Sequence, residues 1–131
     1  MKLRDIAELL DAQFITGEDH ADREVTSAFA ADLLSDVLAM VKDEGVLLIT
    51  GMTTPQVVRV AEVMNMGAVL FVRGKLPTAS TVAYASGTAI PLLATRRIMF
   101  ETCGALYQGG LDPARRKHFP VDHGTPDERG S

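Results

Sequence analysis

Short apolar runs alternate with amphipathic runs along most of the chain. Residues 46–50 (VLLIT), 68–72 (AVLFV) and 90–94 (IPLLA) are apolar runs of the kind expected for strands that are buried on both faces of a sheet. Each run is followed by turn residues and then by apolar residues at helical spacing. The pattern therefore predicts three successive strand–helix units.

Cap residues mark the starts of the helices in these units. Pro55 is predicted at the first position of its helix after a threonine cap, because proline lacks the N–H group that would be unpaired there anyway. The next helix is predicted to start at Thr78 or Ser80, and the last to run over residues 97–107. Helices of this length between strands are typical of parallel strand–helix–strand connections.

The N-terminal part of the chain predicts further elements. Residues 3–10 carry apolar side chains at helical spacing, and residues 13–16 and 25–30 are candidate strands at the edges of the sheet. Asp32 is predicted to cap a helix that extends to about residue 42, since its carboxylate can accept hydrogen bonds from the first-turn N–H groups.

Strands that alternate with helices through short loops imply right-handed crossovers and a mainly parallel sheet. We therefore predict a single α/β domain over residues 1–111, with an open sheet of four or five strands flanked by helices. Residues 112–131 are polar, contain proline and lack periodicity, which predicts a flexible C-terminal tail.

Composition narrows the choice of partners and compartment. The 131 residues are 47% hydrophobic and 23% charged, which suits one domain with an aliphatic core. A net charge of −4 argues against nucleic-acid binding, which requires clustered Lys and Arg. Cys103 is the single cysteine, and no signal peptide or membrane-spanning run is evident, so we expect a cytoplasmic protein without a membrane partner.

Three loops carry the candidate ligand-binding residues. In open α/β sheets ligands bind beyond the carboxyl ends of the strands, where helix N-termini favour anions. If the three apolar strands are neighbours, their loops converge on one rim that is rich in hydroxyl and cationic groups. The residues are Thr50, Gly51, Thr53 and Thr54 in the first loop, Arg73, Gly74 and Lys75 in the second, and Thr95, Arg96 and Arg97 in the third. The alternative is that each loop holds only ordinary turn and cap residues.

A pair of carboxylates lies near this rim. Asp32 and Asp36 are four residues apart, so both fall on one face of a helix and could hold a metal or a cationic group. The alternative is a helix cap and one exposed acid. We include both residues in the predicted ligand site, and we assign no metal and no cofactor to it.

Complete catalytic motifs are absent from the sequence. There is no phosphate-binding G-x-x-x-x-G-K-[ST] loop, no G-x-G-x-x-G, no G-x-S-x-G and no C-x-x-C. His20, His118 and His123 all fall outside the predicted rim. We therefore predict no catalytic residues and no enzyme activity, and metal-assisted chemistry at Asp32 or Asp36 is the remaining enzymatic alternative.

Residues 25–111 resemble the DRTGG domain, a small module that is also attached to phosphotransacetylases and to some regulated pyrophosphatases. The matching segments are AADLLSDVLA, VLLITG, AVLFVRGK, TASTVAYA, IPLLAT and FETCGALYQGGL. The fold implied is also related to the N-terminal domain of HPr kinase/phosphorylase, which lacks the kinase machinery. The family's signature positions fall here on Met52-Thr53 and on Arg73-Gly74-Lys75, where only Gly74 is kept.

The resemblance implies a regulatory or sensory module that forms a homodimer and binds a small ligand. The cations of the predicted rim favour an anion, and a nucleotide is the ligand that the resemblance suggests. Small residues in FETCGALY and TASTVAYASG, which permit close packing against another surface, also favour a homodimer. The alternative function is a protein-interaction subunit that docks on an enzyme or a signalling partner without a small ligand.

Overall fold

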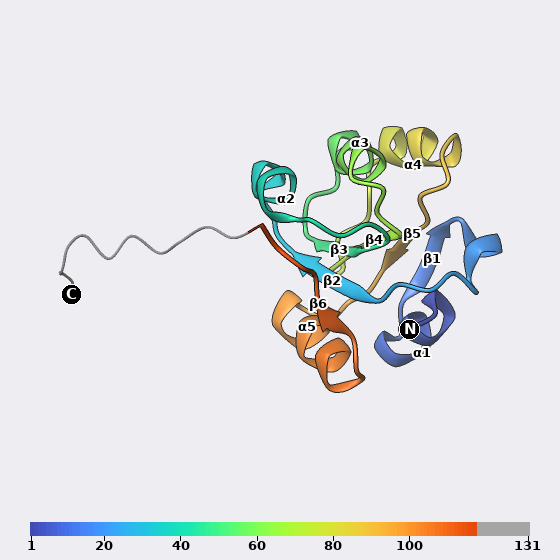
Figure 1. Cartoon of the computed structure of the whole chain (residues 1–131). Helices are drawn as coiled ribbons and strands as arrows, with labels where there is room; N and C mark the ends of the chain where they lie inside the picture. Colours follow the sequence, from blue (N-terminus) through green and yellow to red (C-terminus); the bar gives the residue numbers. More distant parts are fainter. Residues whose placement is uncertain (118–131) are drawn as a thin grey trace.

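The computed structural model describes residues 1–117, which form one mixed sheet with helices on both of its faces (Figure 1). The strands are β1 (Gln13–Thr16), β2 (Ser27–Ala30), β3 (Leu47–Thr50), β4 (Ala68–Phe71), β5 (Leu92–Ala94) and β6 (Asp112–Pro113). The helices are α1 (Leu3–Leu10), α2 (Leu34–Met40), α3 (Pro55–Val63), α4 (Ala79–Ser86), α5 (Met99–Gln108) and the short 3₁₀ helix η1 (Glu18–His20).

The strand order is β1-β5-β4-β3-β2-β6, and all neighbouring pairs are parallel except β1 with β5. Strands β2 to β5 lie side by side in chain order. Helices α2, α3 and α4, which connect them, cover one face, while α1 and α5 cover the other (Figure 1). The predicted α/β class and mainly parallel sheet are confirmed.

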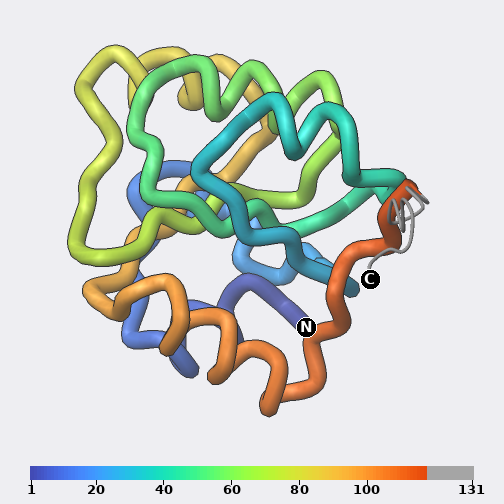
Figure 2. Tube along the Cα trace, turned by 90° about the vertical axis from the view of Figure 1, so that its left-hand side faces the viewer, coloured from blue at the N-terminus to red at the C-terminus, as the bar shows by residue number. Residues whose placement is uncertain are grey.

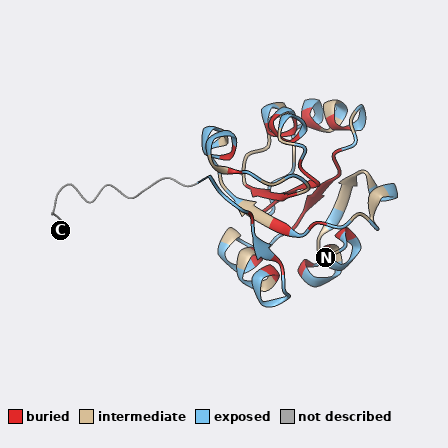
Figure 3. Ribbon diagram, in the orientation of Figure 1, coloured by how far each residue is buried: buried red, intermediate tan, exposed pale blue. Residues whose placement is uncertain are grey.

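The central strands are buried on both faces, which explains their continuous apolar sequences. All residues of β3 and β4 are buried (Figure 3). Alternate side chains of a strand point to opposite faces, so Leu48 packs in the cluster under α2–α4, while Leu47 and Ile49 pack in the cluster with α1 and α5. Both faces of the sheet therefore need apolar side chains.

Two of the predicted helix starts are confirmed, and one is wrong. Pro55 is the first residue of α3, and the Thr78 hydroxyl accepts a hydrogen bond from the Thr81 N–H (3.3 Å) at the start of α4. The prediction that Asp32 caps α2 is wrong. That helix begins at Leu34 without a side-chain cap, because the Asp32 carboxylate accepts the Gly51 N–H instead (2.7 Å).

The prediction that a tail begins at residue 112 is wrong for residues 112–117. Asp112 and Pro113 pair in parallel with Ser27 and Ala28, which adds a sixth strand to the predicted four or five. The Lys117 N–H donates to the Met40 carbonyl (2.9 Å). Figure 2 shows this segment rising along the edge of the sheet from α5 to the end of α2. The rest of the predicted tail, residues 118–131, lies outside the described residues.

None of the helices described in residues 1–117 is long and apolar enough to cross a membrane.

Candidate functional site

The loops after β4 and β5 leave the sheet toward opposite faces. Strand β4 leads to α4 on one face, whereas its neighbour β5 leads to α5 on the other (Figure 1). Such a divergence at the carboxyl ends of two adjacent parallel strands is the topological switch point, where open α/β sheets form a crevice for ligands. The strand order alone therefore places a candidate site between these two loops.

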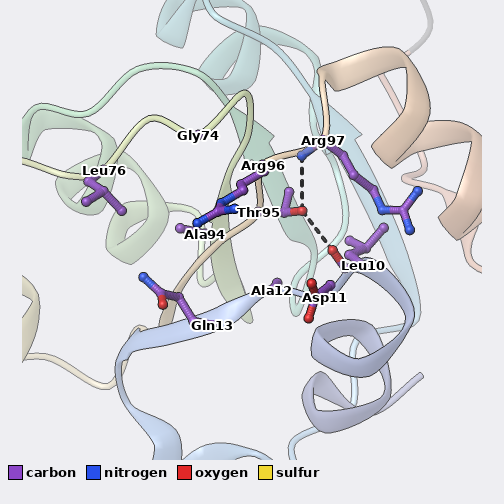
Figure 4. A pocket seen from close by; sticks show the side chains of 10 residues that line it. All are labelled: Leu10, Asp11, Ala12, Gln13, Gly74, Leu76, Ala94, Thr95, Arg96 and Arg97. Carbon is purple, nitrogen blue, oxygen red and sulfur yellow. Dashed lines mark hydrogen bonds between the residues drawn. The ribbon is translucent and has the colours of Figure 1, made fainter.

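A cavity of about 700 Å³ occupies this position (Figure 4). One wall is formed by Gly74 and Leu76 of the β4–α4 loop, and another by residues 94–97 at the end of β5. The third wall is formed by residues 10–13, where α1 ends and β1 begins. The wall from residues 10–13 was missed in the sequence, because it reaches the cavity only through the antiparallel pairing of β1 with β5.

Charged and amide side chains line the cavity. Arg96 and Arg97 are exposed and extend to opposite sides of Thr95, with Arg96 on the same side as Gln13 (Figure 4). Asp11, whose φ of 50° ends α1 in the left-handed conformation, is the one acidic residue of the lining. The cavity therefore offers cationic donors, an amide and the apolar side chain of Leu76 to a ligand.

The buried hydroxyl of Thr95 holds two of these walls together. It donates a hydrogen bond to the Leu10 carbonyl (2.9 Å) and accepts one from the Arg97 N–H (3.3 Å), as Figure 4 shows. Its donor is used within the fold, so Thr95 positions the wall and is not itself free to donate to a ligand.

A tight turn at Arg73 and Gly74 joins the β4–α4 loop to the β5–α5 loop. Arg73 and Gly74 both adopt left-handed backbone conformations, with φ of 66° and 69°. Their N–H groups donate to the carbonyls of Arg97 (2.7 Å) and Thr95 (3.0 Å). Glycine adopts this conformation without steric cost, whereas at Arg73 it is strained. Gly74 thus lines the cavity, while Lys75 is exposed and is not part of its lining.

A second polar cluster lies one strand along the same edge. Asp32 Oδ1 accepts hydrogen bonds from the Gly51 N–H (2.7 Å) and the Thr50 hydroxyl (3.2 Å). A Cβ atom on Gly51 would lie 3.7 Å from both Arg73 Nη2 and Asp32 Oδ2, so the two charged groups flank this glycine. They do not form an ion pair in the described part of the chain. Asp32 therefore stabilises the turn after β3, and its other carboxylate oxygen and the Arg73 guanidinium both lie close to Gly51.

The remaining candidate residues of the first loop serve the fold. The Thr53 carbonyl accepts hydrogen bonds from the Thr81 hydroxyl (2.6 Å) and the Thr78 N–H (3.2 Å), which ties the start of α3 to the start of α4. Thr54 precedes α3 without a side-chain cap. Neither residue belongs to the lining of the cavity at the switch point.

The expected pairing of Asp32 and Asp36 on one helical face is not observed. Asp36 is exposed in the first turn of α2, whereas Asp32 precedes the helix and turns toward Gly51. Across residues 1–117, no group of three or more His, Cys, Asp or Glu side chains is arranged to hold a metal ion.

Comparison with known proteins gives a likeness in structure but not in sequence. No protein-family model matches the chain, and no curated protein matches it. A crystal structure of the CBS and DRTGG domains from the regulatory region of Clostridium perfringens pyrophosphatase, complexed with the activator diadenosine tetraphosphate, matches with a TM-score of 0.65. The likeness supports a DRTGG-like fold.

The match extends over most of this chain and about half of the other. The two chains are 15% identical, and the match covers 92% of this chain and 53% of the other. This chain therefore spans about half the length of the chain that it matches. At this identity the fold is shared, and the matching protein is a regulatory region that was crystallised with a nucleotide activator.

Proposed function

We propose that this domain is a non-catalytic regulatory or sensory module, which binds a small anionic ligand in the cavity at the switch point and forms a homodimer. The observation that carries the ligand proposal is the cavity of about 700 Å³ between the diverging β4–α4 and β5–α5 loops. Its volume lies within the roughly 300–1,000 Å³ of small-molecule sites, and two arginines line it.

Anionic ligands fit the electrostatics of this place. A guanidinium group donates paired hydrogen bonds to phosphate or carboxylate oxygens, and Arg96 and Arg97 supply two such groups. Helix α5 begins at Met99, two residues beyond Arg97. The positive end of its dipole is therefore close in the sequence to the cavity wall that carries both arginines. These features favour a negative charge on the ligand.

A nucleotide is the class of anion that we favour. Leu76 and the Gln13 amide give the lining an apolar contact and hydrogen-bonding groups, which suit a base or ribose as well as a phosphate. The regulatory region of which about half matches this fold was crystallised with diadenosine tetraphosphate, and this supports a nucleotide over a simple phosphate. Arg73 and the free oxygen of Asp32, at the next strand end, would meet a ligand that extends beyond the cavity.

Isothermal titration of the full chain with ATP, AMP, diadenosine tetraphosphate and pyrophosphate tests this function. We expect saturable binding of at least one nucleotide, weakened at least tenfold in Arg96→Ala. Arg116→Ala is the matched control, because it removes the same charge next to Val41, beyond the opposite edge of the sheet.

Two results would overturn the proposal. One is equal affinity in Arg96→Ala and in the unaltered protein, which would move the ligand away from the cavity. The other is no heat change with any of the four compounds. A phosphotransfer assay on the same samples should show no ATP turnover, since the chain has no phosphate-binding loop.

A further inference from the structure

An apolar groove runs beside α5 on the face that is opposite α2–α4. Its volume is about 370 Å³, and it lies between α5 and the edge of the sheet formed by β2 and β6. Ala28, Ile49 and Leu111 contribute to its apolar walls, and Asp112 is its one charged lining residue. The groove is separate from the candidate ligand cavity and shares no lining residue with it.

Two aromatic side chains of α5 form part of this groove and are largely exposed. Phe100 is 85% exposed, the highest value among the large hydrophobic residues described, and Tyr107 is 70% exposed. They are seven residues apart, which places them on one side of the helix two turns apart. Cys103 and Gly104 lie between them on the same side.

Gly104 leaves a hollow between these two rings. A Cβ atom placed on Gly104 would meet no heavy atom within 4 Å, so the helix backbone is open to an incoming group. Small residues at such a position let another helix approach closely. The face therefore carries two exposed rings and, at Gly104, a stretch of helix backbone that is open to a group from another copy.

We propose that a second copy of this chain packs on this face, α5 against α5, with Phe100 of each copy entering the hollow at Gly104 of the other. A twofold interface uses the same patch on both copies and must be self-complementary. A face that carries its own protrusion and its own recess meets this requirement. The proposal locates the homodimer of the proposed function and does not depend on its ligand.

Charge on the face also suits a second copy. Glu101 is the only charged residue of α5, and Asp112 is the only one in the groove lining. Pairing two copies brings like charges together, but each copy contributes only these two acidic residues, so the repulsion between the copies is small. An oppositely charged partner would find few charges here to complement.

The two aromatic residues supply a large part of the apolar area that a stable dimer interface needs. Buried Phe and Tyr side chains each cover about 150–250 Å². Phe100 and Tyr107, at 85% and 70% exposure, thus provide a substantial part of the roughly 800 Å² that each partner buries in a standard interface. Ile98, which is 50% exposed at the start of α5, extends the patch.

Sedimentation of the full chain over 1–100 μM tests this interface. We expect a dimer for the unaltered protein and a monomer at the same concentrations for Phe100→Asp. Gly104→Leu, which fills the hollow without straining the open backbone, should weaken the dimer at least tenfold. Val63→Asp is the matched control, because Val63 is 72% exposed on α3 at the other face, and it should stay dimeric.

Cross-linking through the single cysteine tests the same interface independently. Cys103 lies in the groove, so a short bifunctional maleimide should link two copies of the unaltered protein and should fail with Phe100→Asp. A monomer throughout the concentration range, or a dimer that persists in both α5 variants, would overturn the interface. Nucleotide titration of the same samples separates the two proposals, since a dimer without nucleotide binding defeats only the ligand proposal.

Discussion

Thr95 shows how one buried hydroxyl fixes the shape of the candidate cavity. It is 3% exposed, and its hydrogen bonds reach the end of α1 in one direction and the backbone before α5 in the other. The loop that carries Arg96 is thereby tied to two helices. The sequence predicts Thr95 as a ligand-binding residue, whereas the structure gives its hydroxyl a bond to Leu10, 85 residues away in the chain. No local pattern in a sequence reveals such a contact.

Replacement of Thr95 by valine tests this role. Thr95→Val keeps the shape of the side chain but leaves the Leu10 carbonyl and the Arg97 N–H without this partner. We expect the free energy of unfolding to fall by about 1–3 kcal/mol, as is usual when a buried hydrogen-bonding group loses its partner. Urea unfolding at neutral pH measures the change. Thr95→Ser keeps the hydroxyl and should lose less, so a Val variant as stable as the unaltered protein would contradict the assignment.

At the scale of elements, hydrophobic patterning predicts the strands that bury apolar side chains and misses the one strand that is polar and exposed. The three apolar runs become β3, β4 and β5, because each buries side chains on both faces of the sheet. Strand β6 has only two residues, Asp112 and Pro113, both exposed. Its place depends on its pairing with β2, and such a contact leaves no periodic signal in the sequence, so the sequence assigns it to a tail.

Asp43 and Arg115 secure the segment that follows β6. The backbone N–H of Arg115 donates to one oxygen of the Asp43 carboxylate (2.9 Å), and its guanidinium pairs with the other. These bonds, the backbone one first, lower the pKa of Asp43 below its ordinary value of 3.8. A pKa that is lower in the folded state stabilises the fold above pH 3.8, and this contribution is lost as the pH falls through the folded-state value.

Asp43→Asn should therefore be less stable than the unaltered protein at pH 7, and the gap should shrink below pH 3.8. Urea unfolding of both proteins at a series of pH values measures the gap. Glu44→Gln at the neighbouring position removes a charge without touching Arg115 and serves as the control. A gap that stays constant from pH 7 to pH 2 would show that the ionised carboxylate is not what holds this segment.

At the scale of the whole molecule, the strand order determines where the candidate site lies, and strand order depends on contacts between residues that are far apart in the sequence. The sequence predicts that the three loops share a rim, and β3, β4 and β5 are indeed neighbours. It does not show that α5 returns on the opposite face, or that β1 pairs with β5. Those two facts decide that the cavity opens between the second and third loops, whereas Thr53 and Asp36 lie outside it.

Amide chemical shifts of the labelled protein, followed by NMR during titration with diadenosine tetraphosphate and with ATP, show where on the fold a nucleotide binds. We expect saturable shifts concentrated at Gly74, at residues 95–97 and at residues 11–13, which surround the cavity. The amides of residues 103–107 on α5 should move far less. Shifts that are absent at saturating nucleotide, or that gather elsewhere in the fold, would contradict a ligand site at the switch point.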